Sequence, residues 1–206
     1  MVEAGEEPDR KYVEACDGEY TFEEVDLPTM GKRIKENHGL GRYTFIHDTT
    51  KDDRTTLYFE VEGQFIDMEK ELIRYRAMKE KSREDVCENL RSQTVKAMRM
   101  GRTLALSFGK LKADLTEEIG DPATFDTDLI FDRQRFFDDE KEEYLQIVRK
   151  DEMYAAHMQN MGTFIMLPSF NIVIISNTDD EQFVKYLLDK MPHSDQFSLL
   201  RVTKVY

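Results

Sequence analysis

The chain has 206 residues, of which 40% are hydrophobic and 11% aromatic, and its formal net charge is −13. This length and composition predict one folded globular domain and exclude an intrinsically disordered chain. The excess of acidic residues argues against nucleic acid as a partner. No apolar run approaches the roughly 18 residues that a membrane-spanning helix needs, so we expect a soluble, cytoplasmic protein without a membrane span.

The charge is distributed unevenly along the chain. Residues 1–28 contain ten acidic and two basic residues, which predicts an acidic, flexible N-terminal tail. Residues 29–206 are expected to form a single α/β domain. Within it, residues 29–113 carry eighteen basic and thirteen acidic residues, whereas residues 114–152 carry five and fourteen. We interpret this contrast as solvated helix faces; head-to-tail packing of neighbouring copies is the alternative, and the oligomeric state stays open.

The first half of the chain contains strand patterns followed by a segment of mixed period. Strands are expected over Tyr20–Val25 and Arg42–Asp48, with a polar loop after the second. In residues 57–78, one set of apolar residues alternates like a strand and a second set steps like a helix, with Gly63 between them. The strand-like set is Leu57, Phe59 and Val61, and the helix-like set is Phe65, Met68, Leu72 and Tyr75.

A helix followed directly by a buried strand is the clearest local pattern. Ser82 and Asp85 have the spacing of a capping box, and Gly101 stands where a helix C-cap glycine belongs. The apolar run Thr103–Gly109 begins immediately afterwards. Its length and composition are typical of a parallel strand covered on both faces.

The second half continues the alternation of helices and strands. A long irregular connection over residues 110–135 precedes a helix over 138–150 with Tyr144, Leu145 and Val148 facing inward. The expected elements after it are a short hairpin arm over Gly162–Ile165, a buried strand over Phe170–Asn177, a helix capped by Thr178-Asp179-Asp180, and a final strand over Phe197–Val202. We therefore predict a three-layer α/β sandwich with a mostly parallel, five-stranded sheet flanked by helices.

The phosphate loop that normally gives such a sheet its activity is missing. That loop has the pattern G-x-x-x-x-G-K-[ST], because backbone amides, a lysine and a hydroxyl all contact the phosphates or their Mg²⁺. Residues 48–53 read DTTKDD, without glycine and with carboxylates that would repel a triphosphate. Thr103–Gly109 also ends without an acidic residue that could hold Mg²⁺ or act as a base. We therefore assign no catalytic, cofactor-binding or metal-binding residues and expect no enzymatic activity.

Other candidate sites have weaker patterns. His47 could act as a base beside Asp48, but a residue at a strand end is more often part of the core edge. Residues 48–59 lack the glycine and the glutamate of an EF-hand Ca²⁺ loop. Cys16 and Cys87 predict neither a disulfide framework nor a zinc site. A methionine cluster predicts either core filling or an adaptable binding face; its members are Met153, Met158, Met161 and Met166.

Several short segments resemble the degenerate fifth AAA+ module of dynein heavy chains. The matching segments lie mainly in residues 95–206: Ala97–Leu104, Asp121-Pro122, Pro168–Phe170 leading into Asn171–Asn177, and Phe197–Thr203. The resemblance implies a P-loop NTPase-like, AAA-like domain that has lost hydrolysis. It makes Arg42–Asp48 the first strand, with the phosphate loop replaced, and places Asn177 at a sensor-1-like position. It implies a cytoskeletal setting such as the axoneme of a cilium, without motor activity.

These observations favour a non-catalytic structural or interaction protein, whose partners are other proteins of a larger assembly. One alternative is an atypical small NTPase or phosphotransferase, in which Lys51, Arg54 and Arg201 would supply the positive charge for phosphates. A second alternative is an accessory subunit of some other multiprotein complex.

Overall fold

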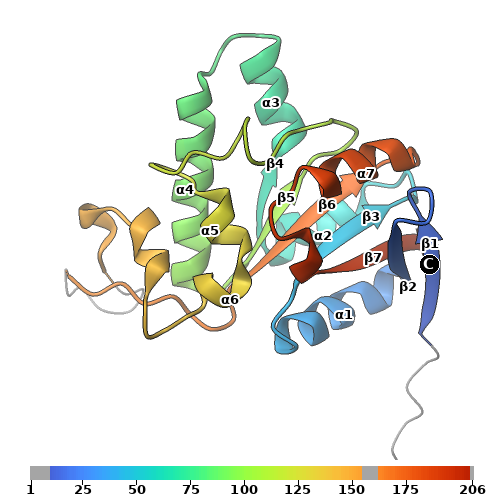
Figure 1. Cartoon of the computed structure of the whole chain (residues 1–206), viewed down its shortest axis with the longest axis horizontal. Coiled ribbons are helices and arrows are strands. Elements are labelled where there is room, and N and C mark those ends of the chain that lie inside the picture. The colour runs from blue at the N-terminus through green and yellow to red at the C-terminus, as the bar shows by residue number, and fades with distance from the viewer. Residues whose placement is uncertain (1–9, 155–161, 205–206) are drawn as a thin grey trace, which may run out of the picture.

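The computed structural model describes residues 10–154 and 162–204, whose strands form one seven-stranded sheet (Figure 1). The spatial order is β1-β2-β7-β3-β6-β5-β4; β1 and β2 are antiparallel, and all other neighbouring strands are parallel. The strands are β1 (Lys11–Ala15), β2 (Tyr20–Asp26), β3 (Tyr43–Asp48), β4 (Gln64–Asp67), β5 (Thr103–Ser107), β6 (Asn171–Asn177) and β7 (Phe197–Lys204).

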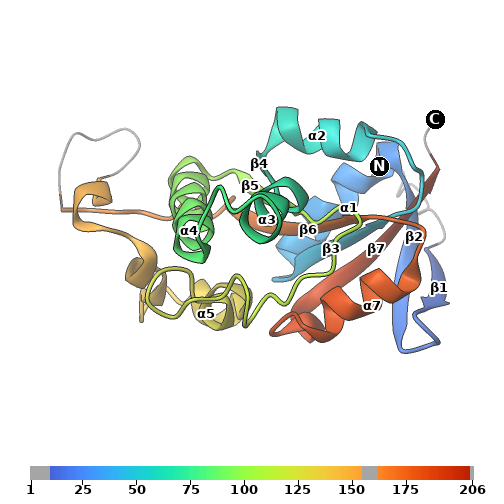
Figure 2. The ribbon, with the colours of Figure 1, turned by 90° about the horizontal axis from the view of Figure 1, so that it is seen from above.

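Helices cover both faces of this sheet, which confirms an α/β fold with a mostly parallel sheet. The helices are α1 (Leu27–Gly39), α2 (Arg54–Glu62), α3 (Met68–Arg76), α4 (Arg83–Met100), α5 (Thr127–Phe131), α6 (Arg133–Phe136) and α7 (Glu181–Asp189). Figure 2 shows α1 and α2 above the sheet and α5 and α7 below it. Among the described residues, no helix is both long and apolar enough to cross a lipid bilayer.

Alternating side chains of the central strands supply two separate cores. In β3, Phe45 joins the core under α3, α4 and α7, while Ile46 joins the core under α1 and α2. β6 divides in the same way, with Ile174 in the first core and Val173 in the second. This two-sided burial explains the continuous apolar run of β6 that the sequence shows.

The segment expected to be a flexible tail is largely part of the sheet. Residues 1–9 lie outside the described residues, but β1 and β2 form a hairpin, and β2 pairs in parallel with β7. Phe22 is completely buried, and Glu23 forms an ion pair of 2.7 Å with Arg33 of α1, both side chains being 7% exposed. The acidic residues of this segment therefore meet basic partners and apolar contacts that local composition does not reveal, and the expected boundary at residue 28 is wrong.

The sheet consequently has seven strands rather than the five expected. The strand-like set Leu57, Phe59 and Val61 belongs instead to α2, which ends at Glu62 with Gly63 as its C-cap. The short strand β4 follows at once and pairs with β5. Of the helix-like set, Met68, Leu72 and Tyr75 lie in α3, which confirms a helix there, whereas Phe65 belongs to β4.

The predicted caps of α4 are confirmed. Ser82 accepts a hydrogen bond from the backbone N–H of Asp85, and the Asp85 side chain accepts one from Ser82 N–H. Gly101 has a φ of 60°, the left-handed conformation in which glycine is favoured. The helix expected after Thr178-Asp179-Asp180 is α7, with Asp180 as its N-cap.

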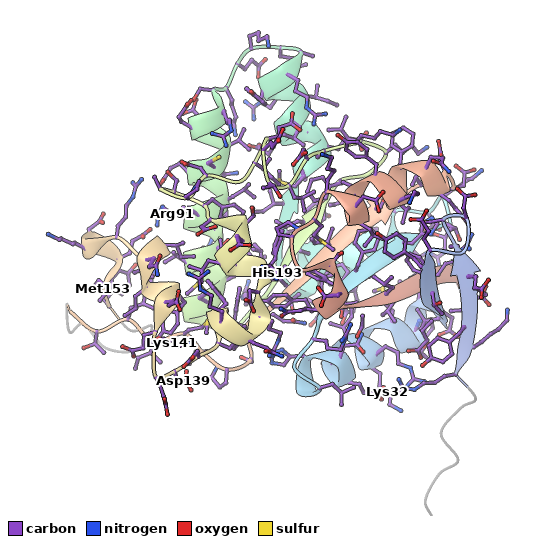
Figure 3. All side chains as sticks on the ribbon, in the orientation of Figure 1. Lys32, Arg91, Asp139, Lys141, Met153 and His193 are labelled. Atoms are coloured by element: carbon purple, nitrogen blue, oxygen red, sulfur yellow. The ribbon has the colours of Figure 1, made fainter. Side chains whose placement is uncertain are left out.

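Residues 138–152 contain short 3₁₀ turns in place of the expected helix. The turns are η1 (Glu143–Ile147) and η2 (Lys150–Glu152). They are joined to α4 by Arg91, which is 4% exposed and donates to the Ile147 carbonyl and to the Glu152 carboxylate at 2.8 and 2.6 Å. Figure 3 labels Arg91 on α4 beside this segment. A side chain from α4 thus satisfies polar groups of these turns, which a continuous helix would have paired internally.

Two further sequence expectations fall on the neighbouring segment. Gly162–Ile165 is not a hairpin arm, because these residues form no strand. Of the methionine cluster, Met158 and Met161 lie outside the described residues, whereas Met153 and Met166 pack partly buried against the core.

Candidate functional site

The carboxyl ends of the parallel strands gather polar side chains at one edge of the sheet. Asp48 ends β3, Asp67 ends β4, Ser107 ends β5 and Asn177 ends β6. In open α/β sheets, ligands bind in the crevice outside the carboxyl ends of the strands, at the point where the connections switch from one side of the sheet to the other. A crevice of ≈ 440 Å³ is present here, and its lining includes Asp67, Ser107 and Asn177.

The loop after β3 satisfies its own backbone amides with its own side chains. Asp48 Oδ1 accepts hydrogen bonds from the Thr50 N–H and hydroxyl, at 2.8 and 2.6 Å. Asp52 Oδ1 accepts from the N–H of Arg54, the first residue of α2, at 2.8 Å. The N–H of Thr49 donates to the Val202 carbonyl of β7. In a phosphate loop, the backbone amides point toward the bound anion. Here the amides of Thr50 and Arg54 are already bonded to carboxylates, and the amide of Thr49 is bonded to a carbonyl.

The three cations that the sequence suggested for phosphate binding each form an ion pair with a carboxylate. Lys51 Nζ lies 2.6 Å from Asp179 Oδ2, and Arg54 Nε lies 3.5 Å from Asp52. Arg201 pairs with Glu181 at 3.2 Å on the α7 side of the sheet, whereas Arg54 begins α2 on the opposite face. The fold therefore does not bring these three cations together around one anion.

His47 is a core-edge residue and does not form a dyad with Asp48. It is completely buried, and its Nε2–H donates to the Thr178 carbonyl at 2.8 Å. Burial is the largest effect and lowers the pKa of His47; the hydrogen bond to the Thr178 carbonyl raises it, and the weaker effect of Arg201 lowers it again. Side chains alternate along a strand, so Asp48 points to the other face. Its Oδ2 atom is buried without a hydrogen-bond partner among the described residues.

Asn177 lies where the sequence resemblance placed a sensor-like residue, at the end of β6. Its Nδ2 donates to the Asp52 carbonyl at 3.4 Å and so joins β6 to the loop after β3. Asn177 also lines the crevice. The hydrogen bond that Asn177 forms in this structure is therefore one within the protein.

Neither cysteine has the surroundings of an activated thiol. Both are free and buried. Burial raises the pKa of Cys16 to about 11, with a further contribution from Glu181, and burial also raises the pKa of Cys87. A nucleophilic thiol needs the opposite shift. In the part of the chain that the structure describes, no three His, Cys, Asp or Glu side chains are grouped as a metal site requires.

Sequence reasoning missed one polar residue, Asn171, at the opposite edge of the sheet. It is the first residue of β6 and is 2% exposed, yet neither its Oδ1 nor its Nδ2 has a hydrogen-bond partner within the described ranges. The only available sequence signal was a polar residue at the start of an otherwise apolar run.

No protein-family model, curated protein or solved structure matches this chain significantly.

Proposed function

We propose that this protein is a non-catalytic interaction module, a degenerate P-loop-type, AAA-like domain that docks within a larger protein assembly. The resemblance of residues 95–206 to the fifth AAA+ module of dynein heavy chains supports this assignment. The mostly parallel sheet, with β3 between β6 and β7, is compatible with it. The proposed axonemal setting depends on the sequence resemblance alone.

The observation that carries the proposal is the occupation of the loop amides by Asp48 and Asp52. Binding a nucleotide there would require both carboxylates to release their N–H partners and to lie beside phosphate oxygens of the same charge. Asp53, Asp67 and Glu69 add further negative charge to the crevice, against Lys51 and Lys110. Repulsion and lost hydrogen bonds both oppose phosphate binding.

The acidic segment 114–152 supports a role in docking. It has fourteen acidic and five basic residues, and Asp139, Glu140 and Glu142 are exposed. Such a surface is complementary to a basic partner and would accelerate association at low ionic strength.

Thermal unfolding with and without MgATP or MgGTP tests the absence of nucleotide binding. We expect no change in Tm. A nucleotide that did bind would be detected, because a ligand at a hundred times its Kd stabilises the native state by about 2.7 kcal/mol. A nucleotide-dependent rise in Tm that the Lys51→Ala/Arg54→Ala variant abolishes would instead favour the atypical NTPase or phosphotransferase.

A second variant tests the reason for that absence. In Asp48→Ala/Asp52→Ala, the amides of Thr50 and Arg54 lose their carboxylate partners, and we expect ATP to protect this variant more than the wild type. Equal responses would show that the loop carboxylates do not exclude nucleotide.

Size-exclusion chromatography tests docking itself. The full chain purified from its source should elute at an apparent mass well above that of one chain, and elution as a monomer would contradict the proposal.

A further inference from the structure

The edge of the sheet at β1 is open in the part of the chain that the structure describes. β1 is the first strand in the spatial order and pairs with β2 alone, so alternate residues of β1 turn their N–H and C=O groups away from the sheet. β2 is also the only described element that packs extensively against β1, and both ribbon views show β1 at the margin of the sheet (Figures 1 and 2). Such an edge is a template for a further strand.

The opposite edge of the sheet is less accessible to a further strand. β4 has four residues, against five in β1. The Gln64 side chain of β4 donates to Gln93 of α4 at 2.8 Å, and side chains of α2, α3 and α4 line the space along the strand. A strand that adds to β4 must fit among these side chains. β1 is therefore the edge better suited to pairing.

One face of β1 carries a cation, an aromatic ring and an anion in succession. Side chains alternate along a strand, so Arg10, Tyr12 and Glu14 share this face. It is the face covered by α1, because Tyr12 lies opposite Glu23, which pairs with Arg33 of α1. Tyr12 is 56% exposed. The exposed Glu14 carboxylate has no hydrogen bond or ion pair with another described residue.

Arg10 is positioned at the start of β1 with donors to spare. Its guanidinium lies 3.6 Å from Glu23 and 3.4 Å from Glu36, distances longer than the roughly 2.7–2.9 Å of a strong charge-assisted hydrogen bond. The side chain is 31% exposed, and a guanidinium has five N–H donors. A further carboxylate can therefore bind to Arg10 without displacing the first two.

The charges of β1 select one register for pairing with a second copy of the chain. Two copies of one strand pair antiparallel about a two-fold axis that passes through a residue, because opposed residues must orient their backbone groups alike. An axis through Lys11 opposes two lysines, and an axis through Glu14 opposes two glutamates. An axis through Val13 places Tyr12 opposite Glu14 and forms no ion pair. An axis through Tyr12 places Arg10 of each copy opposite Glu14 of the other.

We propose that the chain forms a homodimer in which two β1 strands pair antiparallel about an axis through Tyr12. The two sheets become one continuous sheet, the two Tyr12 rings lie side by side, and an ion pair between Arg10 and Glu14 closes each end of the contact. One five-residue strand per copy makes a small interface, so we expect a Kd of about 10–300 µM. The inference does not depend on the proposed function, because the recombinant chain alone, without any partner, suffices to test it.

Sedimentation velocity of the full chain over about 5 to 500 µM tests the dimer. We expect a concentration-dependent change from monomer to dimer, together with ¹H–¹⁵N shifts at residues 10–15 and none at residues 64–67. A monomer at every concentration, or shifts confined to another surface, would overturn the proposal. Species that grow beyond a dimer would do so too, because they would indicate head-to-tail pairing of β1 with β4.

Glu14→Lys and Glu60→Lys are matched variants, since both glutamates are exposed and unpaired among the described residues but lie at opposite edges of the sheet. Glu14→Lys places a second cation opposite Arg10 and should weaken the dimer at least about tenfold, whereas Glu60→Lys should dimerise like the wild type. An unchanged Kd in Glu14→Lys, or an equal loss in Glu60→Lys, would contradict the assignment.

A cysteine in place of Tyr12 tests the register. The axis brings the two Cα atoms at this position to about 4.5–5.5 Å, within the range of a disulfide. In Glu14→Cys the two Cα atoms lie roughly 13 Å apart. With oxidised glutathione as the oxidant, Tyr12→Cys should form a disulfide-linked dimer much faster than Glu14→Cys, while the buried Cys16 and Cys87 stay reduced. Equal rates in the two variants would refute the axis through Tyr12.

Discussion

At the scale of single residues, His47 couples the fold to pH. Its ring is completely buried against Phe22, with centroids 5.8 Å apart, and Nε2–H is held by the Thr178 carbonyl. Burial lowers the pKa of His47 from its usual value near 6.5. The hydrogen bond to the Thr178 carbonyl opposes this shift, Arg201 lowers the pKa further, and Glu181 and Asp48 raise it by smaller effects. The native state therefore holds this imidazole neutral.

The free energy of unfolding should fall as the pH drops below about 6.5, because the unfolded chain then binds a proton that native His47 resists. One such group changes stability by at most about 1.4 kcal/mol per pH unit, and its contribution is fully present above pH 6.5. Urea unfolding at pH 5 to 8 measures the slope. In His47→Gln, we expect a smaller slope over pH 5 to 6.5. An unchanged slope in that variant would mean that His47 is not the group responsible.

The sequence predicted the chemistry of the loop at residues 48–53 only in part. The missing glycine and the acidic residues indicated that phosphate would not bind. The hydrogen bonds from Thr50 and Arg54 to Asp48 and Asp52 depend on side-chain rotamers and the local turn, which composition does not specify. Asn171 was not predictable at all, because a buried unpartnered amide and a solvated one look the same in a sequence.

At the scale of elements, the β1–β2 hairpin shows how charge can mask a structural segment. Phe22 and Val25 face the interior, while Glu23 pairs with Arg33 and Lys11 pairs with Glu24. The basic partners of β2 lie outside the strand itself, partly in α1. The sequence therefore predicted the strand over Tyr20–Val25 but, from local charge, assigned the segment around it to a flexible tail, whereas the fold has a β-hairpin there.

Phe22→Ala should destabilise the protein by about 3–5 kcal/mol, because it opens a cavity beside Phe45 and His47. Tyr12→Ala on the neighbouring strand is the matched control: Tyr12 is 56% exposed, so its truncation should change stability by no more than about 0.5 kcal/mol. Denaturant unfolding of both variants measures the difference. A stability near that of the wild type for Phe22→Ala would restore the interpretation of this segment as a tail.

Helices were predicted best where their end signals were local. The caps of α4 and α7 depend on residues within four positions of each helix end, so sequence alone identified them. The expected strand over residues 57–61 and the expected helix over residues 138–150 are wrong, because tertiary contacts determine the structure there. The Arg91 contacts to residues 147 and 152 are an example, since they connect positions more than fifty residues apart.

At the scale of the whole molecule, the two cores share their strands. Phe45 and Ile46 are consecutive residues of β3, yet they belong to different cores, so loss of β3 from the sheet disrupts both. The sequence predicted this two-sided sheet from its buried runs. It could not predict the position of β2 beside β7, because that pairing joins the two ends of the described chain.

Unfolding should therefore occur as one cooperative transition. Far-ultraviolet circular dichroism, near-ultraviolet circular dichroism and calorimetry should give coincident midpoints, and the calorimetric and van't Hoff enthalpies should agree. Two separated transitions would show that the core under α1 and α2 melts independently of the other.

The pairing of β2 with β7 also determines when the protein can fold during its synthesis. The β1–β2 hairpin leaves the ribosome well before its partner strand β7 (Phe197–Lys204), and the two neighbours of β3 are the late strands β6 and β7. β2 and β3 must therefore wait for strands that follow much later in the chain, and such distant pairings form slowly. Until β6 and β7 have been synthesised, the nascent chain therefore exposes the open edges of β2 and β3, and we expect it to be prone to aggregation during that interval.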